Sequence, residues 1–342
     1  MKTLDIRGLS GTSRILVGEN AGHLSRHLPP GRTVFITDEN VRHAQPAIFE
    51  RRDPIVIPAG EGSKTLETVA GLYDRLLALE ADRATFLVGV GGGVVCDIAG
   101  FAASTYLRGL SFGYVATTLL AQADASVGGK TGVNFGGYKN MVGVFSQPRF
   151  VLCDPAVLGT LSAVEVRNGI AEIVKHAAIA SPSLFSALEG RGRDLLSLPP
   201  GLIEEIVFAS VSIKAAIVSG DERESGERRK LNFGHTLGHA FESTLGLSHG
   251  EAVSLGMAAA ADFSVRRGLL PESDSRRLRA LLEAFGLPTT APFDRNRIAD
   301  AVGKDKKRAG RSIKFVFLRA IGEAVVEDVD LGESEAYVPN LR

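Results

Sequence analysis

The hydrophobic periodicity of this chain changes once, near Asp154, and this change limits the possible folds more than any other feature. Before it, short apolar runs alternate with segments of helical spacing; the runs lie at residues 33–37, 55–57, 85–88, 112–115 and 150–152. Continuous apolar runs of this kind are typical of a parallel sheet covered on both faces. The first part of the chain is therefore predicted to be an α/β domain.

After Asp154 the chain consists mainly of long amphipathic segments. Their apolar residues recur every three or four positions, at residues 163–179, 201–220, 251–268 and 274–285. Strand-like residues are almost missing until 313–318. We therefore predict two domains, an α/β domain over residues 1–155 and a mainly helical domain over residues 156–342.

The composition limits which kinds of partner the protein can bind and in which cellular compartment it is expected. The 342 residues carry 39 Lys and Arg against 39 Asp and Glu, so the positive field of a nucleic-acid or membrane-surface binder is missing. Cys96 and Cys153 lack C-x-x-C spacing, which favours a reducing compartment. No apolar run is long enough to span a bilayer, and the first residues lack the apolar segment of a secretory signal. We expect a cytoplasmic protein with no nucleic-acid partner and no membrane association.

Three consecutive glycines join the apolar run at residues 85–90 to a helical pattern at 98–106. Backbone N–H groups in such a loop can approach a phosphate, and the helix N-terminus adds favourable partial charge. Asp97 is expected in the first helical turn, where the helix dipole would stabilise it even as a simple cap. Asp38 closes an earlier strand, where doubly wound folds contact a ribose hydroxyl. The loop lacks the G-x-G-x-x-G fingerprint, so phosphate binding and a tight turn both remain open.

Four lysines are candidates for binding an anion. Lys130 and Lys139 lie among glycines, where an ammonium group either meets an anion or is solvated. Lys175 and Lys214 lie inside apolar helical segments. Each of these two must form an ion pair, line a cavity or extend to the surface.

Three of the seven histidines fall between residues 235 and 249. His235 and His239 are four residues apart and would share a helix face, while His249 lies just before the next helical segment. A catalytic zinc ion usually takes three protein ligands and keeps one open position. Glu172 lies among apolar neighbours, where an unpaired charge would be costly, so it is the natural third ligand. At this point a metal site and ordinary core or capping histidines are both open.

Taken together, the motifs closely resemble the 3-dehydroquinate synthase family over nearly the whole chain. They lie, in order, at residues 91–97, 108–109, 117–122, 124–130, 139–140, 169–175 and 231–239. The resemblance implies a Rossmann-like parallel-sheet NAD domain followed by a helical metal-binding domain, in a homodimer. It implies a carbon–oxygen lyase that converts 3-deoxy-D-arabino-heptulosonate 7-phosphate (DAHP) to 3-dehydroquinate and phosphate, in the shikimate pathway. The implied route is transient oxidation by NAD, phosphate elimination, reduction, ring opening and aldol closure.

The resemblance also implies roles for particular residues. Glu172, His235 and His249 would bind zinc, for which cobalt can substitute. NAD would be bound by Asp38, Glu61, Lys64, Gly92, Gly93, Asp97, Thr117, Thr118, Asp124, Lys130, Lys139 and Thr160. Substrate would be bound by Lys130, Asn140, Lys175, Lys214, Arg228, Asn232, His239 and Lys306, the last preferred over Lys307. Arg108 matches an arginine that reaches into the neighbouring subunit's site.

Two departures and two alternatives accompany this interpretation. Many relatives have proline where this chain has Ala116, and glycine where it has Tyr138; both changes affect the backbone rather than a reacting side chain.

Another sugar-phosphate cyclase, making an inosose or a valiolone, would share the chemistry. A metal-dependent polyol dehydrogenase would leave the lysine and arginine set unexplained, because its substrates are neutral. We expect Lys130, Lys214 and Arg228 to line solvent-accessible space rather than the core.

Overall fold

The computed structural model describes residues 1–50, 52–306, 312–330 and 332. The chain forms two compact units that are not contiguous in sequence. The first comprises Met1–Leu161 and Pro200–Arg223, and the second comprises Ser162–Pro199 and Glu224–Arg342. The sequence predicted a single boundary near residue 155, and did not anticipate that the chain returns to the first unit. It returns because helix α6 (Pro200–Gly220) packs on strands β1 and β2 of that unit.

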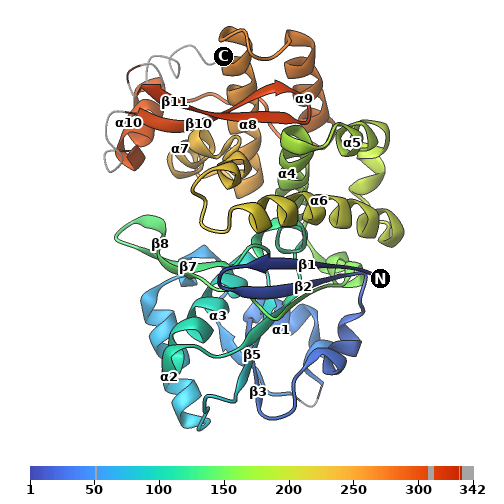
Figure 1. The fold of residues 1–342 in the computed structure, drawn as a ribbon, viewed down its shortest axis with the longest axis vertical. Helices are drawn as coiled ribbons and strands as arrows, with labels where there is room; N and C mark the ends of the chain where they lie inside the picture. Colours follow the sequence, from blue (N-terminus) through green and yellow to red (C-terminus); the bar gives the residue numbers. More distant parts are fainter. Residues whose placement is uncertain (51, 307–311, 331, 333–342) are drawn as a thin grey trace. The chain divides into compact units, whose positions relative to one another are not determined.

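The first unit is built on a seven-stranded sheet of order β1-β2-β9-β6-β5-β3-β4 (Figure 1). Its strands are β1 (Lys2–Gly8), β2 (Gly11–Val17), β3 (Thr33–Asp38), β4 (Ile55–Ile57), β5 (Phe86–Gly91), β6 (Phe112–Ala116) and β9 (Phe150–Cys153). All neighbouring pairs are parallel except β1 with β2. Strands β5, β6 and β9 are buried along their whole length, which confirms the predicted α/β architecture. The β1–β2 hairpin was not predicted.

Helices connect the parallel strands of this unit. They are η1 (Ala21–His27), α1 (Glu39–Ala44), η2 (Pro46–Phe49), η3 (Glu61–Ser63), α2 (Leu66–Ala78), α3 (Gly93–Thr105), η4 (Tyr106–Arg108), the π-helical turn η5 (Ala121–Ala125) and η6 (Pro155–Thr160). In α2 the side chain of Thr65 caps the first turn by accepting from the backbone N–H of Thr68 at 3.2 Å. Val69, Leu72 and Leu76 form the buried face of α2, while Leu77 is 63% exposed.

A separate hairpin of β7 (Lys130–Phe135) and β8 (Tyr138–Phe145) belongs to the same unit. Gly136 and Gly137 form its two-residue turn with φ of +58° and +80°, a backbone that glycine adopts without steric cost. No strand was predicted here, because β8 is almost wholly exposed and lacks a buried apolar face.

The second unit is mainly helical, as predicted. Its elements are α4 (Ala163–Ala180), α5 (Pro182–Leu195), η7 (Glu227–Asn232), α7 (His235–Leu245), α8 (His249–Arg266), α9 (Glu272–Ala284), α10 (Arg295–Lys306), β10 (Ser312–Ala320) and β11 (Glu323–Asp330). Helix α8 is buried over most of its length and contacts α4, α7, α9 and β10. Among the described residues, no helix combines the length and hydrophobicity needed to cross a membrane.

Candidate functional site

Glycines shape the loop at the carboxyl end of β5. Gly92 is the N-cap of α3, and a Cβ placed on it would lie 2.9 Å from the Thr118 Cγ2 methyl. A Cβ on Gly93 would lie 3.2 Å from Ala125. The backbone N–H of Thr117 donates to the Gly91 carbonyl at 3.0 Å, while the Thr117 Oγ1 atom is buried without a hydrogen-bond partner in the described part of the chain. A tight backbone cradle, a helix N-terminus and an unsatisfied buried hydroxyl suit a phosphate-bearing ligand.

Asp97 lies in the second turn of α3, which corrects the expectation of a first-turn residue. The difference arises because α3 begins at Gly93, so the glycines themselves form its N-terminus. Burial raises the pKa of Asp97, and the nearby Lys64 ammonium only partly offsets this effect. The Lys64 Nζ atom lies 2.5 Å from Asp97 Oδ2 and 2.5 Å from Asn140 Oδ1. Three residues assigned by resemblance to cofactor or substrate thus form one hydrogen-bonded group.

Asn134 links this group to the η3 turn, and the sequence did not single it out. Its side-chain Oδ1 accepts from the backbone N–H of Asn140 at 2.9 Å, and its Nδ2 donates to Glu61 Oε1 at 2.8 Å. Its own backbone N–H donates to the Lys64 carbonyl at 2.8 Å. The bond to Asn140 supports a left-handed backbone there, with φ of +53°.

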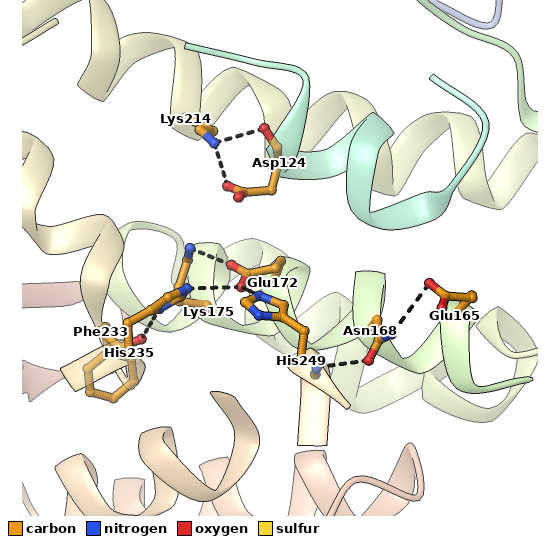
Figure 2. A network of polar contacts seen from close by, with 10 residues as sticks. Asp124, Glu165, Asn168, Glu172, Lys175, Lys214, Phe233, His235 and His249 are labelled. Atoms are coloured by element: carbon orange, nitrogen blue, oxygen red, sulfur yellow. Dashed lines mark hydrogen bonds and ion pairs between the residues drawn. The ribbon is translucent and has the colours of Figure 1, made fainter. Parts of the chain in front are cut away.

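Asp124 and Lys214 form a second polar contact within the first unit (Figure 2). The Lys214 Nζ atom donates to the Asp124 carboxylate at 2.7 Å and to its backbone carbonyl at 2.8 Å. Lys214 is only 7% exposed, so the expectation that it lines solvent-accessible space is wrong. Its burial is tolerated because both interactions compensate the ammonium charge.

The remaining predicted residues of this unit lie in different settings. Asp38 caps α1, its Oδ1 accepting from the backbone N–H of Val41 at 2.8 Å, and the Thr160 hydroxyl accepts from Gln45 at 3.0 Å. Lys130 and Lys139 are exposed on the β7–β8 hairpin. Arg108 is exposed and has φ of +68°, next to Leu107 with φ of +49° and Gly109 with φ of +121°.

In the second unit, three helices bring together Glu172, His235 and His249 (Figure 2). Glu172 Oε1 lies 3.0 Å from His249 Nε2 and 3.3 Å from His235 Nε2. One ligand atom from each of the three residues lies within 4.8 Å of the other two. Two imidazoles and one carboxylate are a common ligand set for catalytic zinc, so the residues present fit such an ion.

The charge of Glu172 is compensated although its side chain is fully buried. Burial by itself would raise the pKa of this carboxyl, but the Lys175 ammonium and the two imidazoles hold it well below its usual range. Lys175 forms an ion pair with Glu172 Oε2 from one turn further along α4. Burial lowers the pKa of His249, and the hydrogen bond and charge of Glu172 more than offset this, so its pKa is raised. An ionised carboxylate is therefore already present among the candidate ligands.

Neighbouring groups orient the histidines. His235 Nδ1 lies 3.3 Å from the Phe233 carbonyl, which directs Nε2 toward Glu172. The His239 ring meets the His235 ring edge-on, with centroids 5.5 Å apart. His249 is the first residue of α8, not the residue before it, because the helix begins two residues earlier than predicted.

Other predicted substrate residues of this unit lie on η7 and α10. Arg228 is 2% exposed, so the expectation that it lines solvent-accessible space is wrong for this residue too. The Asn232 side chain donates to the Glu224 carboxylate. Lys306 ends α10, but its side chain is outside the description, and Lys307 lies outside the described residues altogether.

Solved structures with this fold define the class of protein. The chain matches a 2-deoxy-scyllo-inosose synthase complexed with carbaglucose-6-phosphate, NAD+ and Co2+, with a TM-score of 0.87, 27% identity and 100% of both chains covered. It matches a 2-epi-5-epi-valiolone synthase from Streptomyces hygroscopicus with NAD+ and Zn2+ bound, with a TM-score of 0.89, 30% identity and 99% of both chains covered. An NADH-dependent butanol dehydrogenase from Thermotoga maritima shares the fold alone, at a TM-score of 0.67 and 14% identity over 95% of this chain and 96% of that one. The fold is that of the sugar-phosphate cyclases.

Sequence relatives specify the family. The family model for the 3-dehydroquinate synthase N-terminal region matches residues 54–168, and the model for the C-terminal region matches residues 169–308. A 3-dehydroquinate synthase from Caulobacter vibrioides is 46% identical, over 84% of this chain and 80% of the relative. Another from Halorhodospira halophila is 44% identical, over 89% of this chain and 88% of the relative. The chain belongs to the 3-dehydroquinate synthase family, and it is an enzyme.

Proposed function

We propose that this protein converts DAHP to 3-dehydroquinate and phosphate, as a carbon–oxygen lyase of the shikimate pathway. The observation that carries the proposal is the convergence of buried Glu172 with His235 and His249 in a chain of this family. The curated relatives named above support the choice of reaction. Zinc or cobalt and NAD are the proposed cofactors, because solved structures of this class contain them.

Glu172, His235 and His249 would hold the metal ion, and Lys175 would remain beside it. When bound, the ion supplies a Lewis acid that lowers the pKa of a substrate hydroxyl. The role of Glu172 is to present an ionised oxygen at the site, and its low pKa is suited to that role. His235 is held by the Phe233 carbonyl, so its Nε2 atom faces the site before any ligand arrives.

The NAD site would include the loop at Gly92 and Gly93, together with Thr117 and Thr118. When bound, the nicotinamide supplies a reversible hydride acceptor, so it is recycled rather than consumed. The Thr117 hydroxyl would gain the hydrogen-bond partner that it lacks. The other residues proposed to contact NAD are Asp38, Glu61, Lys64, Asp97, Asp124, Lys130, Lys139 and Thr160.

The proposed substrate carries a carboxylate and a phosphate, which require cationic partners. The proposed partners are Lys130, Asn140, Lys175, Lys214, Arg228, Asn232, His239 and Lys306. Lys175 and Lys214 each pair with a carboxylate in the structure, so neither ammonium is an uncompensated buried charge. With substrate bound, each of these two ammonium groups would interact with its carboxylate partner and with an anionic group of the substrate.

We further propose a cytoplasmic homodimer in which Arg108 reaches the neighbouring subunit's site. Three successive positive φ angles at Leu107, Arg108 and Gly109 support a functional role for this turn. Left-handed backbone at non-glycine residues is costly and often accompanies function. The turn presents Arg108 to solvent in the single chain, where a second subunit could contact it.

Phosphate release from DAHP by purified protein, with NAD+ and zinc present, tests the function. We expect one phosphate per 3-dehydroquinate formed and no net NADH. Accumulation of NADH with an oxidised product, without phosphate release, would instead identify a dehydrogenase. Turnover of glucose 6-phosphate, or of a heptulose phosphate without the carboxylate, in preference to DAHP would identify another cyclase.

A further inference from the structure

Helix α8 begins with a capping box. Ser248 is the N-cap residue, and its hydroxyl and backbone N–H both bond to the Glu251 carboxylate, at 2.7 and 3.0 Å. The first N–H groups of a helix have no partner within the helix and need other acceptors. Here the N–H of Gly250 donates to the side-chain Oδ1 of Asn168, at 2.8 Å, and Asn168 belongs to α4 (Figure 2).

This bond joins the two helices close to their candidate metal ligands. Gly250 directly follows His249, and Asn168 lies one turn before Glu172 on α4. Asn168 is itself buried, and its Nδ2 faces Glu165 Oε2 at 3.4 Å, which orients the amide. The Asn168 amide therefore connects the backbone that carries His249 to the helix that carries Glu172.

Gly250 allows the same two helices to approach closely. A Cβ on Gly250 would lie 2.6 Å from the Asn168 Cα atom and 3.1 Å from the Arg167 carbonyl oxygen. Contacts of 2.6 Å to backbone cannot be relieved by moving a flexible side chain, so any larger residue must push α8 away from α4. The hydrogen bond from Gly250 to Asn168 and the absence of a side chain at Gly250 therefore both affect the distance between the ligand atoms of Glu172 and His249.

We infer that Asn168 and Gly250 are positioning residues, which hold the His249 imidazole at the distance from Glu172 that a single divalent ion requires. The inference rests on the proposed metal site and extends it to residues that contact no ligand. Outer-shell partners of metal ligands typically change metal affinity about 10- to 100-fold when they are lost. Because Asn168 acts through the backbone, we expect the lower end of this range.

Zinc affinity, measured by competition with a chromophoric chelator, tests the inference without turnover. Asn168→Leu and Gly250→Ala should each weaken zinc binding about tenfold and alter the visible spectrum of the cobalt-loaded protein. Asn168→Asp in a Glu165→Gln background keeps an acceptor for the Gly250 N–H and avoids two adjacent carboxylates. This variant should recover most of the affinity of the Glu165→Gln parent.

Two controls separate positioning from general stability. Ser162→Ala removes the N-cap of the same helix α4, where the hydroxyl accepts from the Glu165 N–H at 3.3 Å, and should lower Tm without changing zinc affinity. Gly190→Ala adds a Cβ where no atom lies within 4 Å and should leave zinc affinity unchanged. Parent-like zinc affinity and cobalt spectra in folded Asn168→Leu and Gly250→Ala would overturn the inference. Parent-like zinc affinity in His235→Ala would instead show that the proposed metal site is wrong.

Discussion

Each of the two units has a polar centre in which a buried or half-buried carboxylate lies beside a lysine. The pKa of the carboxyl is shifted in opposite directions in the two centres. At Asp97 burial prevails and the pKa is raised, although Lys64 lies 2.5 Å away. At Glu172 the partners prevail and the pKa is lowered, although the side chain is fully buried. Asp97 has Lys64 as its main counter-charge and Glu61 opposes it, whereas Glu172 has Lys175 and two imidazoles.

The number of cationic partners, more than burial, therefore sets the direction in which the pKa of these two interior carboxyls is shifted. The two centres also differ in construction. Loops and a glycine-rich helix start build the first, so backbone N–H groups are available to a ligand. Three helices build the second, so side chains converge and are held by helix packing. The first arrangement suits an anionic ligand, and the second suits a cation.

Loss of both histidines should disable the site formed by Glu172, His235 and His249. The double variant His235→Ala/His249→Ala removes both imidazoles and should abolish stoichiometric zinc binding and turnover, because one carboxylate cannot retain the ion. Metal analysis after dialysis measures this directly. His43→Ala, on the exposed face of α1, is the matched control and should keep full occupancy. Full zinc occupancy in the double variant would contradict the ligand assignment.

A change in the loop centre should have a smaller effect. Gly92→Val places bulk against Thr118 and in the space proposed for a pyrophosphate. An overpacking cost of about 1–3 kcal/mol corresponds to roughly five- to hundredfold weaker NAD+ binding. Calorimetric titration with NAD+ measures it, with Gly71→Val on α2 as control, since nothing lies within 4 Å of a Cβ there. Equal NAD+ affinity in both variants would exclude the loop as the cofactor site.

The pairing of Lys214 with Asp124 in the first unit has two explanations. Lys214→Met removes a charge-assisted contact of about 1.5–3 kcal/mol, which predicts roughly a ten- to hundredfold fall in kcat/KM for DAHP. If Lys214 binds substrate, the double variant Lys214→Met/Asp124→Asn has a lower kcat/KM than Asp124→Asn alone. Equal kcat/KM in the double variant and in Asp124→Asn would show that Lys214 only neutralises Asp124. Thermal melts of both variants establish that they are folded.

The smallest expected effect concerns Glu222, a carboxylate of the first unit held by neutral donors. It accepts from the Ser10 backbone N–H at 3.0 Å, from the Ser10 hydroxyl, and from Gln147 at 2.9 Å. Burial by itself would raise the pKa of Glu222, but these hydrogen bonds outweigh it and lower the pKa.

A lowered folded-state pKa stabilises the fold above the unfolded value, and this stability is lost as pH falls through the folded value. Glu222→Gln should therefore reduce the free energy of unfolding by about 1–2 kcal/mol at pH 7. The difference from the parent should narrow as pH falls below about 4. Denaturant unfolding between pH 7 and pH 3 measures both. A difference that stays constant with pH would mean that neutral donors do not favour the ionised form.

Hydrophobic periodicity predicted the elements whose burial is one-sided or complete. It identified β3, β5 and β9 and the helices α4, α8 and α9, because burial leaves a pattern in adjacent residues. The β7–β8 hairpin left no such pattern, since its outer strand is exposed along its length. The cluster of Glu172, His235 and His249 could be anticipated because its residue types are rare together.

The roles of Asn134 and Asn168 could not be predicted from sequence. Each amide acts through partners that are distant in sequence, Glu61 in one case and Gly250 in the other. The sequence around an asparagine does not indicate which distant residue its side-chain amide will contact. Likewise, the start of α3 at Gly93 was not predicted, because glycine has a low intrinsic helix propensity.

The return of α6 to the first unit has a consequence for the order of events during synthesis. The ribosome completes all seven strands of the main sheet before residue 161, and then makes Ser162–Pro199, which belongs to the second unit. Only afterwards does α6 emerge to cover β1 and β2. Until then the apolar surface that α6 covers stays exposed on the nascent chain, where such surface promotes aggregation. A fragment ending at residue 161 should therefore bind chaperones, and a fragment that joins residues 200–223 directly to it should bind them less.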